Sequence, residues 1–467
     1  MSRHPFSAVN LISDPIHGYV ELTKRLADAE ADAAGLPREE AAEEDLLDTA
    51  WVQRLRRISQ LQSARWVFPT AEHSRFTHGL GVMHEAGAWA RSLYPSLRAA
   101  LVAAGEPLPS EGLVVETLRI AGLLHDVGHG PFAHFFDDHV LGAFAAPPDP
   151  RRVPGKALSH EDLSQVIVER ELGPLIAALR RAPGGVATRD AFATGESIDP
   201  RWVSFIVSKP ALSDGGMPRW VRWLQPLLSG VFTVDNLDYV RRDAYMTGVA
   251  VDVDVERLRR YTFIGDRGLT LYEPGLGALE MFLTARLFLY QQVYFHRTVR
   301  AIDLDLAEVF GPSVRAIFGD ASPVEQLSLY ADLDEYALLH QAARWARGES
   351  VAAEPRAGDG TVTRAVAEGW RAILLRQPSW RSEAEVRAEY EAGARPDELI
   401  ATLGEASAGS VAIDLAIVDA RPADATATDS LLAVEGRDGS SLSLAASLGR
   451  LPAYALIGRR YRRLARG

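Results

Sequence analysis

The chain has 467 residues, a formal net charge of −12 and no cysteine. The negative charge argues against a general affinity for phosphate polymers, and the lack of cysteine excludes disulfide bonds and thiolate ligands. No apolar stretch reaches the roughly 18 residues of a membrane span, and residues 1–15 lack the apolar core of a signal peptide. We therefore expect a cytoplasmic protein that does not bind membranes. We do not expect nucleic acid to be its main partner.

The first two-thirds of the sequence is patterned mainly as helices. Residues 51–62 place apolar side chains at helical spacing, with Asp48 available as the N-cap. Residues 111–127 are apolar on most sides, which predicts a buried helix that ends at the Gly- and Pro-containing residues 128–131. Further helices are predicted from Ser159 to about Leu172, over residues 225–245 and over residues 276–310.

Loops and a change of pattern divide the chain. Residues 26–45 are rich in alanine and acidic residues and predict a solvated helical insertion, residues 145–157 carry four prolines, and residues 353–362 read as a linker. After about residue 400 the apolar residues alternate as in strands. The expected fold class is mainly α, with a helical core over residues 1–320, a helical extension over 321–400 and a small α/β appendix over 401–467.

Residues of metal-ligand type stand at the ends of apolar runs: His78 in SRFTHGLGV, His125 and Asp126 in AGLLHDVGHG, and Asp235 in VDNLDYVRRD. Imidazoles and carboxylates together suit a first-row metal or a Mg-type cation. A metal held in this way can activate water at neutral pH, so hydrolysis is the first hypothesis. Each residue also has a structural explanation, since a His–Asp pair can close a helix and His78 can be a hydrogen-bonded core histidine.

Three more histidines follow the His–Asp pair, namely His129, His134 and His160. Histidine titrates near neutrality and is the usual proton-transfer side chain. So many titratable groups at the ends of predicted elements favour a reaction site over unrelated structural residues.

The segments RFTHGLGV, LLHDVGHGPFAHFFD, SHED and DNLDYVRRDAYMTG, in that order, resemble the HD-domain phosphohydrolases. The likeness is closest to the deoxynucleoside triphosphate triphosphohydrolases, both the bacterial dGTPase type and the vertebrate sterile-alpha-motif/HD enzyme, and it runs from SDPIHGYVEL to about residue 300. It implies an HD-domain core, a divalent metal ion (Mn, Fe, Mg, Zn, Ni or Co) and a homo-oligomer. The implied reaction converts a deoxynucleoside triphosphate to a deoxynucleoside and inorganic triphosphate.

The resemblance also implies roles for individual residues. The metal ligands would be His78, His125, Asp126 and Asp235. His134 would be the acid/base group oriented by Asp137, and His129 and His160 would complete the polar cluster around the phosphate. The substrate contacts would be Arg75, Gln60, Leu61, Tyr239, Asp243, Arg286, Tyr294 and His296. The alternative for the arginines is an ion-paired surface position, and for the tyrosines it is core packing.

One position departs from the pattern of the vertebrate relative. After the metal-ligand aspartate that enzyme has a phosphate-holding lysine, whereas this chain has Asn236. An amide does not replace a point charge on a triphosphate. Either Arg75, Arg286 and the metal suffice, or the substrate carries fewer phosphates.

A second resemblance concerns regulation. Asp48, Gln53 and Arg56 fall where the vertebrate enzyme binds an activating guanine nucleotide at a subunit interface, which implies a GTP or dNTP activator. The structural alternative is a helix cap followed by two exposed helix residues.

Two rival functions stay open. One is a nucleotide sensor that retains the HD fold and responds by a change of conformation or assembly. The other is an HD phosphatase that acts on a signalling or lower-phosphate nucleotide.

Overall fold

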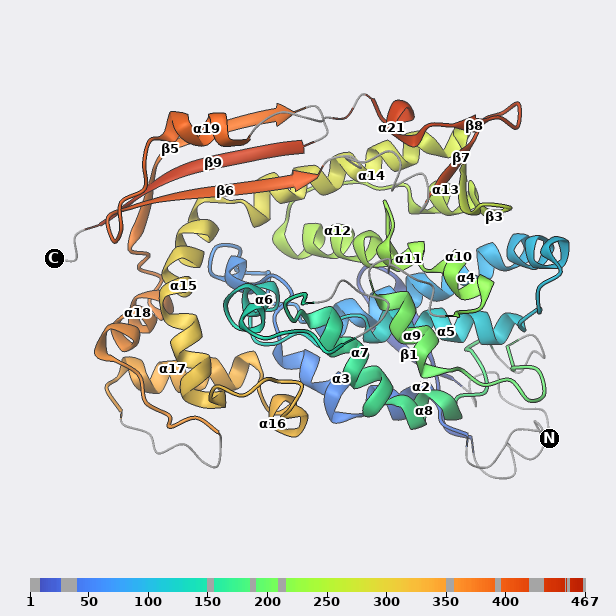
Figure 1. Ribbon diagram of the computed structural model, residues 1–467, viewed down its shortest axis with the longest axis horizontal. Helices are drawn as coiled ribbons and strands as arrows, with labels where there is room; N and C mark the ends of the chain where they lie inside the picture. Colours follow the sequence, from blue (N-terminus) through green and yellow to red (C-terminus); the bar gives the residue numbers. More distant parts are fainter. Residues whose placement is uncertain are drawn as a thin grey trace.

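The protein is mainly α, as the sequence predicted. The structure, a computed structural model, describes residues 9–26, 40–148, 155–184, 190–208, 216–349, 357–390, 396–419, 432–449, 451 and 454–464. Most of the predicted acidic insertion, and parts of the two predicted loops near residues 150 and 353, lie outside these ranges. Helices form the body of the molecule, and the C-terminal strands lie along one side of it (Figure 1). Among the described helices, none combines the length and apolar character that crossing a bilayer requires.

An antiparallel hairpin, which the sequence did not predict, opens the described chain: β1 (Val9–Asp14) and β2 (Gly18–Thr23). The next element is α2 (Glu43–Leu47). The prediction of a single helix over residues 51–62 is wrong. It is instead α3 (Ala50–Arg54) followed by η1 (Leu55–Arg57), and its N-cap is Thr49, because Asp48 closes α2. The chain then extends at Ile58 so that its carbonyl accepts the Arg75 N–H and the Gln60 N–H bonds the His73 carbonyl, before η2 (Gln62–Trp66).

Two long helices form the centre of the body. These are α4 (Arg75–Ala104) and α5 (Glu111–Leu124), and every residue of α5 after Glu111 is buried. Glycine lets their backbones approach closely, since a Cβ on Gly122 would lie 2.9 Å from the Val82 carbonyl oxygen and one on Gly79 would lie 3.2 Å from that of Leu123. This approach places His78 of α4 beside His125, the C-cap of α5.

Shorter helices surround this pair. The capping box of Ser159 and Asp162 starts α7 (His160–Arg170), close to the start predicted for it. The helix predicted over residues 225–245 is divided, because the chain leaves helical geometry at Gly230 and Thr233 caps a new helix. The bounds are α6 (His134–His139), η3 (Leu141–Ala143), α8 (Gly173–Ala178), α9 (Pro200–Val207), α10 (Arg219–Leu224), α11 (Pro226–Ser229), α12 (Val234–Thr247) and α13 (Val255–Arg260).

The helix predicted over residues 276–310 is also divided. After the hairpin of β3 (Thr262–Gly265) and β4 (Gly268–Tyr272) and a short η4 (Glu273–Gly275), α14 spans Leu276–Leu289. A π-helical turn, η5 (Tyr290–Tyr294), and the extended cap His296 precede α15 (Arg297–Phe318).

The C-terminal part contains a three-stranded antiparallel sheet in the order β5-β9-β6. Strand β5 lies in the range expected to be helical, whereas β6 falls where a strand was predicted. Strand β7 pairs in parallel with β4, so it extends the sheet of the core. The bounds are α16 (Leu327–Ala331), α17 (Glu335–Ala346), α18 (Arg364–Leu374), β5 (Trp380–Tyr390), α19 (Pro396–Leu403), β6 (Val411–Asp419), β7 (Ala433–Glu435), β8 (Ser441–Leu442), α21 (Leu444–Ser447) and β9 (Tyr454–Arg463).

Candidate functional site

The predicted metal ligands converge although they lie far apart in the sequence. Donor atoms of His78, His125 and Asp235 all lie within 4.8 Å of one another. Asp126 joins them, with a carboxylate oxygen 3.4 Å from Nε2 of His125 and another 3.9 Å from Nε2 of His78. Helices α4, α5 and α12 thus each contribute to one group of side chains.

Both imidazoles are oriented so that Nε2 faces the centre of this group. His125 donates from Nδ1 to the Gly122 carbonyl at 2.8 Å, which leaves a lone pair on Nε2, and that atom is buried with no hydrogen-bond partner among the described residues. His78 donates from Nδ1 to Asp238 at 2.8 Å. Metal-binding histidines are commonly held in this way through their second nitrogen.

The electrostatics of the group favour a cation. Burial lowers the pKa of His78, but hydrogen bonds with Asp235 and Asp238 outweigh burial and raise the pKa to about 10. Burial raises the pKa of Asp235, but the neighbouring imidazoles of His125 and His78 outweigh burial and lower the pKa, so the carboxyl stays ionised. Oriented imidazole nitrogens and ionised carboxylates fit a divalent first-row metal.

Arg75 adjoins this group at the start of α4. Its Nη1 donates to Asp126 at 2.5 Å, and its Nε is buried with no hydrogen-bond partner in the described part of the chain. Burial raises the pKa of Asp126, but the charge of Arg75 outweighs it and holds the pKa well below its usual range. The guanidinium therefore keeps unused donor capacity beside the metal-type group.

Asp238 is a buried residue of the site that the sequence interpretation missed. It accepts from His78 and from His17 at 2.6 Å, and it receives a bidentate pair from Arg242 at 2.8 and 2.9 Å. A Cβ on Gly81 would lie 2.0 Å from the Asp238 carboxylate, so this glycine makes room for it. The available signal was a second aspartate three residues after Asp235, close to one helical turn away.

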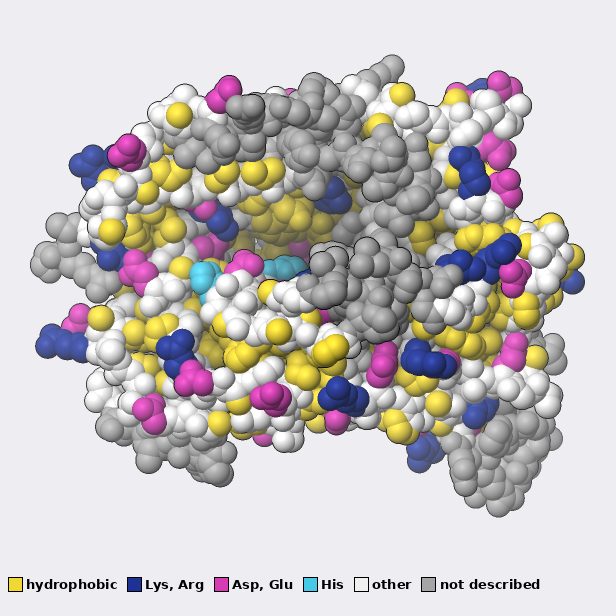
Figure 2. Space-filling model, viewed as in Figure 1, with side chains coloured by type: hydrophobic (Ala, Val, Ile, Leu, Met, Phe, Trp, Pro, Cys, Tyr) yellow, Lys and Arg dark blue, Asp and Glu magenta, His cyan; other side chains and the backbone are white. Residues whose placement is uncertain are grey.

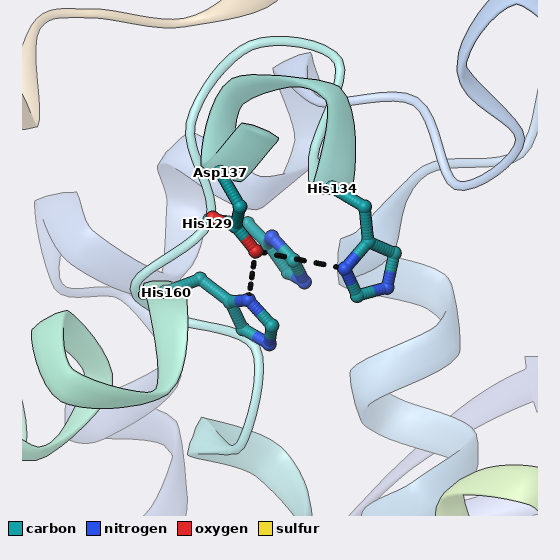
Figure 3. Close-up of side chains that lie close together, drawn as sticks. All are labelled: His129, His134, Asp137 and His160. Atoms are coloured by element: carbon teal, nitrogen blue, oxygen red, sulfur yellow. Dashed lines mark hydrogen bonds and ion pairs between the residues drawn. The ribbon is translucent and has the colours of Figure 1, made fainter. Parts of the chain in front are cut away.

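A second group consists of His129, His134, Asp137 and His160 (Figure 3). The rings of His129 and His160 stack with centroids 3.7 Å apart, and Asp137 pairs with His160 and, at 3.6 Å, with His134. Burial raises the pKa of Asp137, but hydrogen bonds from His134 and His160 outweigh it and keep the pKa well below its usual range. Asp137 is thus an ionised acceptor that orients two imidazoles.

The histidine group touches the metal-type group. Nε2 of His129 lies 3.3 Å from Asp126. Burial and the nearby Arg75 hold the pKa of His129 well below its usual range, so this ring is neutral. His134 differs from the others because its side chain is 63% exposed. An accessible imidazole beside buried partners suits proton exchange with a ligand.

A cavity of about 300 Å³ is bordered by His134 of the histidine group and by Arg75, which bonds Asp126 of the metal-type group. Figure 2 shows a hollow in this face of the molecule, with histidine side chains on its rim. The cavity is within the size range of small-ligand pockets. The predicted residues that border it are Gln60, Leu61, Arg75, His134, Tyr239, Asp243 and Tyr294.

Asp243 and Tyr294 are fixed within the cavity wall. Asp243 bonds His73 at 2.7 Å and accepts from the Tyr294 hydroxyl at 2.5 Å. Two other predicted contacts, Arg286 and His296, do not border the cavity in the described residues. Arg286 lies in the last turn of α14, and His296 caps α15 by accepting from the Thr298 N–H at 3.2 Å.

Several cavity residues received no role from the sequence. Burial and pairing across long sequence separations decide their position, which a single sequence does not reveal. They are Gln62, Ser63, Ala64, Tyr290, Val299, Arg300 and Asp303.

The predicted activator residues lie together on the surface near α3. Asp48 and Arg56 are exposed, and Gln53 is half-buried. Gln53 donates to the Leu47 carbonyl at 2.9 Å and accepts from Arg56 at 2.8 Å, and the Arg56 guanidinium lies 3.6 Å from the centroid of the Phe76 ring. Gln53 and Arg56 therefore each have partners within the chain.

Comparison with known proteins identifies relatives. The family model described as HD domain matches residues 75–183. The uncharacterized protein YwfO of Bacillus subtilis is 28% identical over 358 residues, which cover 73% of this chain and 67% of that protein. The deoxynucleoside triphosphate triphosphohydrolase SAMHD1 of Danio rerio is 27% identical over 355 residues, covering 72% of this chain and 51% of that protein. The human protein of the same name is 27% identical over 314 residues, which cover 65% of this chain and 44% of the human protein.

The chain thus spans about half the length of the SAMHD1 proteins that it matches. Solved structures agree with the fold over nearly the whole chain. A hypothetical protein from Aquifex aeolicus has a TM-score of 0.65 at 23% identity, with 97% of this chain and 96% of that chain covered. A phosphohydrolase from Bacteroides thetaiotaomicron has a TM-score of 0.64 at 19% identity, with 98% and 100% covered. Residues 75–183 therefore match the HD-domain model, as the motifs predicted, and most of the chain is similar at about 27% identity to deoxynucleoside triphosphate triphosphohydrolases.

Proposed function

We propose that this protein hydrolyses deoxynucleoside triphosphates to deoxynucleoside and inorganic triphosphate, with a divalent metal ion as cofactor. The single observation that carries the proposal is the contact between a metal-type group and a histidine group, of which His134 borders a cavity. The names of the SAMHD1 relatives support the choice of substrate.

The metal would be held by His78, His125, Asp126 and Asp235. When bound, it supplies charge neutralisation at the scissile phosphate and lowers the pKa of water. This set of donors accepts Mn, Fe, Mg, Zn, Ni or Co with small changes of geometry.

Side chains of the protein would bind the phosphate, transfer the proton and stabilise the developing charge. Arg75 would bind phosphate oxygens through the donors that Asp126 does not use. His134 would give a proton to the leaving deoxyribose oxygen, with Asp137 fixing its ring. His129 and His160 would stabilise charge on the phosphate, and Arg286 would assist from α14.

The sugar would lie against Gln60 and Leu61. Both border the cavity, and the Oε1 atom of Gln60 is buried with no hydrogen-bond partner among the described residues. A ribose 2′-hydroxyl would meet these side chains, so the deoxy sugar is preferred. Tyr239, Asp243 and Tyr294 would form the facing wall, and His296 would act from the start of α15.

A direct experiment incubates the protein with each dNTP and Mn²⁺ or Mg²⁺ and identifies the released anion by ion chromatography. We expect triphosphate from the wild type and none from His125→Ala or Asp126→Ala. Undiminished hydrolysis by these variants would show that the metal assignment is wrong.

Asn236 provides a specific reason to test a second substrate class. Its amide lies 3.4 Å from Asp235 and offers no charge to a triphosphate. Release of phosphate or pyrophosphate would favour an HD phosphatase on a lower-phosphate or signalling nucleotide. Binding without turnover would favour a nucleotide sensor.

We also propose a homo-oligomer that a GTP or dNTP activator promotes through Asp48, Gln53 and Arg56. The support is the surface cluster of these three residues and the likeness to the SAMHD1 relatives. The same assay with and without GTP, combined with size-exclusion chromatography, tests this part. A rate and an elution volume that do not respond to GTP would contradict it.

A further inference from the structure

A polar pair borders the cavity outside the metal-type and histidine groups. Arg300 and Asp303 lie three residues apart on α15, and both line the cavity. Asp303 accepts from the Ser63 hydroxyl with one oxygen and from Arg300 Nη1, at 3.3 Å, with the other. Neither residue contributes to the groups that hold the metal or the phosphate.

The C-terminal sheet fixes this pair. Asp414 of β6 receives two bonds from Arg300, at 3.0 and 2.5 Å. On β9, Arg459 donates to the carbonyl of Phe295, and the Tyr461 hydroxyl donates to the carbonyl of Arg297 at 2.9 Å. The wall that carries Arg300 and Asp303 is therefore bonded to the sheet at three points. Such bracing suits a site that must present its groups in one geometry.

The charge of this wall differs from that of the metal side. The guanidinium of Arg300 pairs with two carboxylates, those of Asp303 and Asp414, so these three side chains together carry one excess negative charge. Phosphate is repelled here and attracted to Arg75 and the cation site. This distribution of charge favours a nucleotide with its phosphates at the histidines and its base at Asp303.

Asp303 retains capacity to accept hydrogen bonds. Burial raises the pKa of Asp303 to about 6, so at neutral pH the carboxyl is mainly ionised and accepts only. A carboxylate has about four lone-pair positions. Ser63 and Arg300 use one on each oxygen, and no other hydrogen bond to Asp303 forms within the described part of the chain.

We propose that Asp303 selects guanine, by accepting hydrogen bonds from the ring N–H and the amino group on the adjacent carbon of the base. This inference rests on the proposed function because it assumes that the ligand is a deoxynucleotide, but it does not require that the ligand is hydrolysed. Guanine is the common base with two adjacent donors on one edge. The thymine ring N–H lies between two carbonyl oxygens that a carboxylate repels, and adenine and cytosine present an acceptor beside their amino group. A buried acceptor left without its partner gives strong discrimination.

The experiment measures binding of deoxynucleosides by titration calorimetry, in the absence of added metal. Nucleosides carry no phosphate, so the measurement is independent of hydrolysis. We expect the wild type to bind deoxyguanosine at least tenfold more tightly than deoxyinosine, which lacks only the amino group, and than thymidine. Equal affinities, or no binding of any nucleoside at millimolar concentration, would overturn the inference, and this comparison needs no variant.

Asp303→Asn is the decisive variant, because it keeps the size of the side chain and replaces one acceptor by a donor. We expect it to lose the preference for deoxyguanosine. Glu308→Gln is the matched control, since Glu308 lies on the same helix, pairs with Arg463 and does not border the cavity. A preference that survives in Asp303→Asn would refute the role of Asp303. Failure of the proposed function would appear separately, as no release of triphosphate from any dNTP.

Discussion

Individual carboxylates in this protein act through the groups that surround them, and Asp238 is the clearest case. It lies outside the metal-type group, yet it bonds the imidazole of His78, and His17 and Arg242 hold it in turn. Residues of this kind orient a ligand and increase its basicity. We therefore infer that Asp238 is a positioning residue for the candidate cation site.

The substitution Asp238→Asn should lower metal affinity by roughly tenfold to a hundredfold. Metal content after equilibrium dialysis, measured by mass spectrometry, checks this value. Asp252→Asn is the control, because that residue is exposed and lies on the loop after the same helix. Unchanged metal content in Asp238→Asn, alongside its loss in His78→Ala, would contradict the positioning role.

Asp303 predicts a pH dependence of stability. Burial raises its pKa from 3.8 to about 6 in the folded protein, against the attraction of Arg300 and the bond from Ser63. The group contributes stability that is fully present below about pH 4 and is lost as the pH rises through about 6. Relative to the wild type, Asp303→Asn should therefore gain on the order of 2 kcal/mol in unfolding free energy over this interval.

Urea unfolding of both proteins at several pH values between 4 and 7 measures this difference. A difference that does not change with pH would mean that Asp303 is not buried as described. Glu308→Gln is the control, because Glu308 lies on the same helix and is exposed.

The sequence revealed the metal-type and histidine residues because they lie in dense motifs. It did not reveal Ser63, Arg300 and Asp303, whose roles come from partners that are distant in the chain. Ser63 and Asp303 are 240 residues apart, and Arg300 and Asp414 are 114 apart. A single sequence contains no signal for such pairs, since each residue alone resembles an ordinary surface polar residue.

At the scale of elements, the contact between α4 and α5 determines where two of the candidate ligands meet. Gly122→Ala would place a methyl group 2.9 Å from the Val82 carbonyl oxygen, which is backbone and cannot turn away. We expect a loss of about 1–3 kcal/mol in unfolding free energy and weaker metal binding. Gly277→Ala is the matched control, because nothing lies within 4 Å of its added methyl group in α14. It should be neutral or stabilise by roughly 0.5 kcal/mol.

Urea denaturation of both variants measures these changes. If Gly122→Ala is as stable as Gly277→Ala, the close approach of the two helices is not required.

Helix breaks were the least predictable elements. The interval between α14 and α15 contains neither glycine nor proline, so the sequence predicted a continuous helix. Tertiary contacts accompany the break, because Tyr294 bonds Asp243 and the Phe295 carbonyl accepts from Arg459. Helix starts were predicted better where a local cap determines them, as at Ser159.

At the scale of the whole molecule, the candidate cation site joins helices from separate parts of the chain. A cation that binds only the folded protein must raise its stability, by about 2.7 kcal/mol at a hundredfold excess over Kd. Addition of Mn²⁺ should therefore raise the Tm of the wild type and leave that of His125→Ala unchanged. Equal shifts in both proteins would place the binding elsewhere.

The middle strand of the C-terminal sheet is the last of its three strands to be synthesised. Strands β5 and β6 each pair with β9 and do not pair with each other. During synthesis, therefore, β5 and β6 have no strand of this sheet to pair with until β9 has been made. Only then can Arg459 and Tyr461 bond the segment that begins α15. The nascent helical body therefore lacks these two bonds to its pocket wall until β9 has been made.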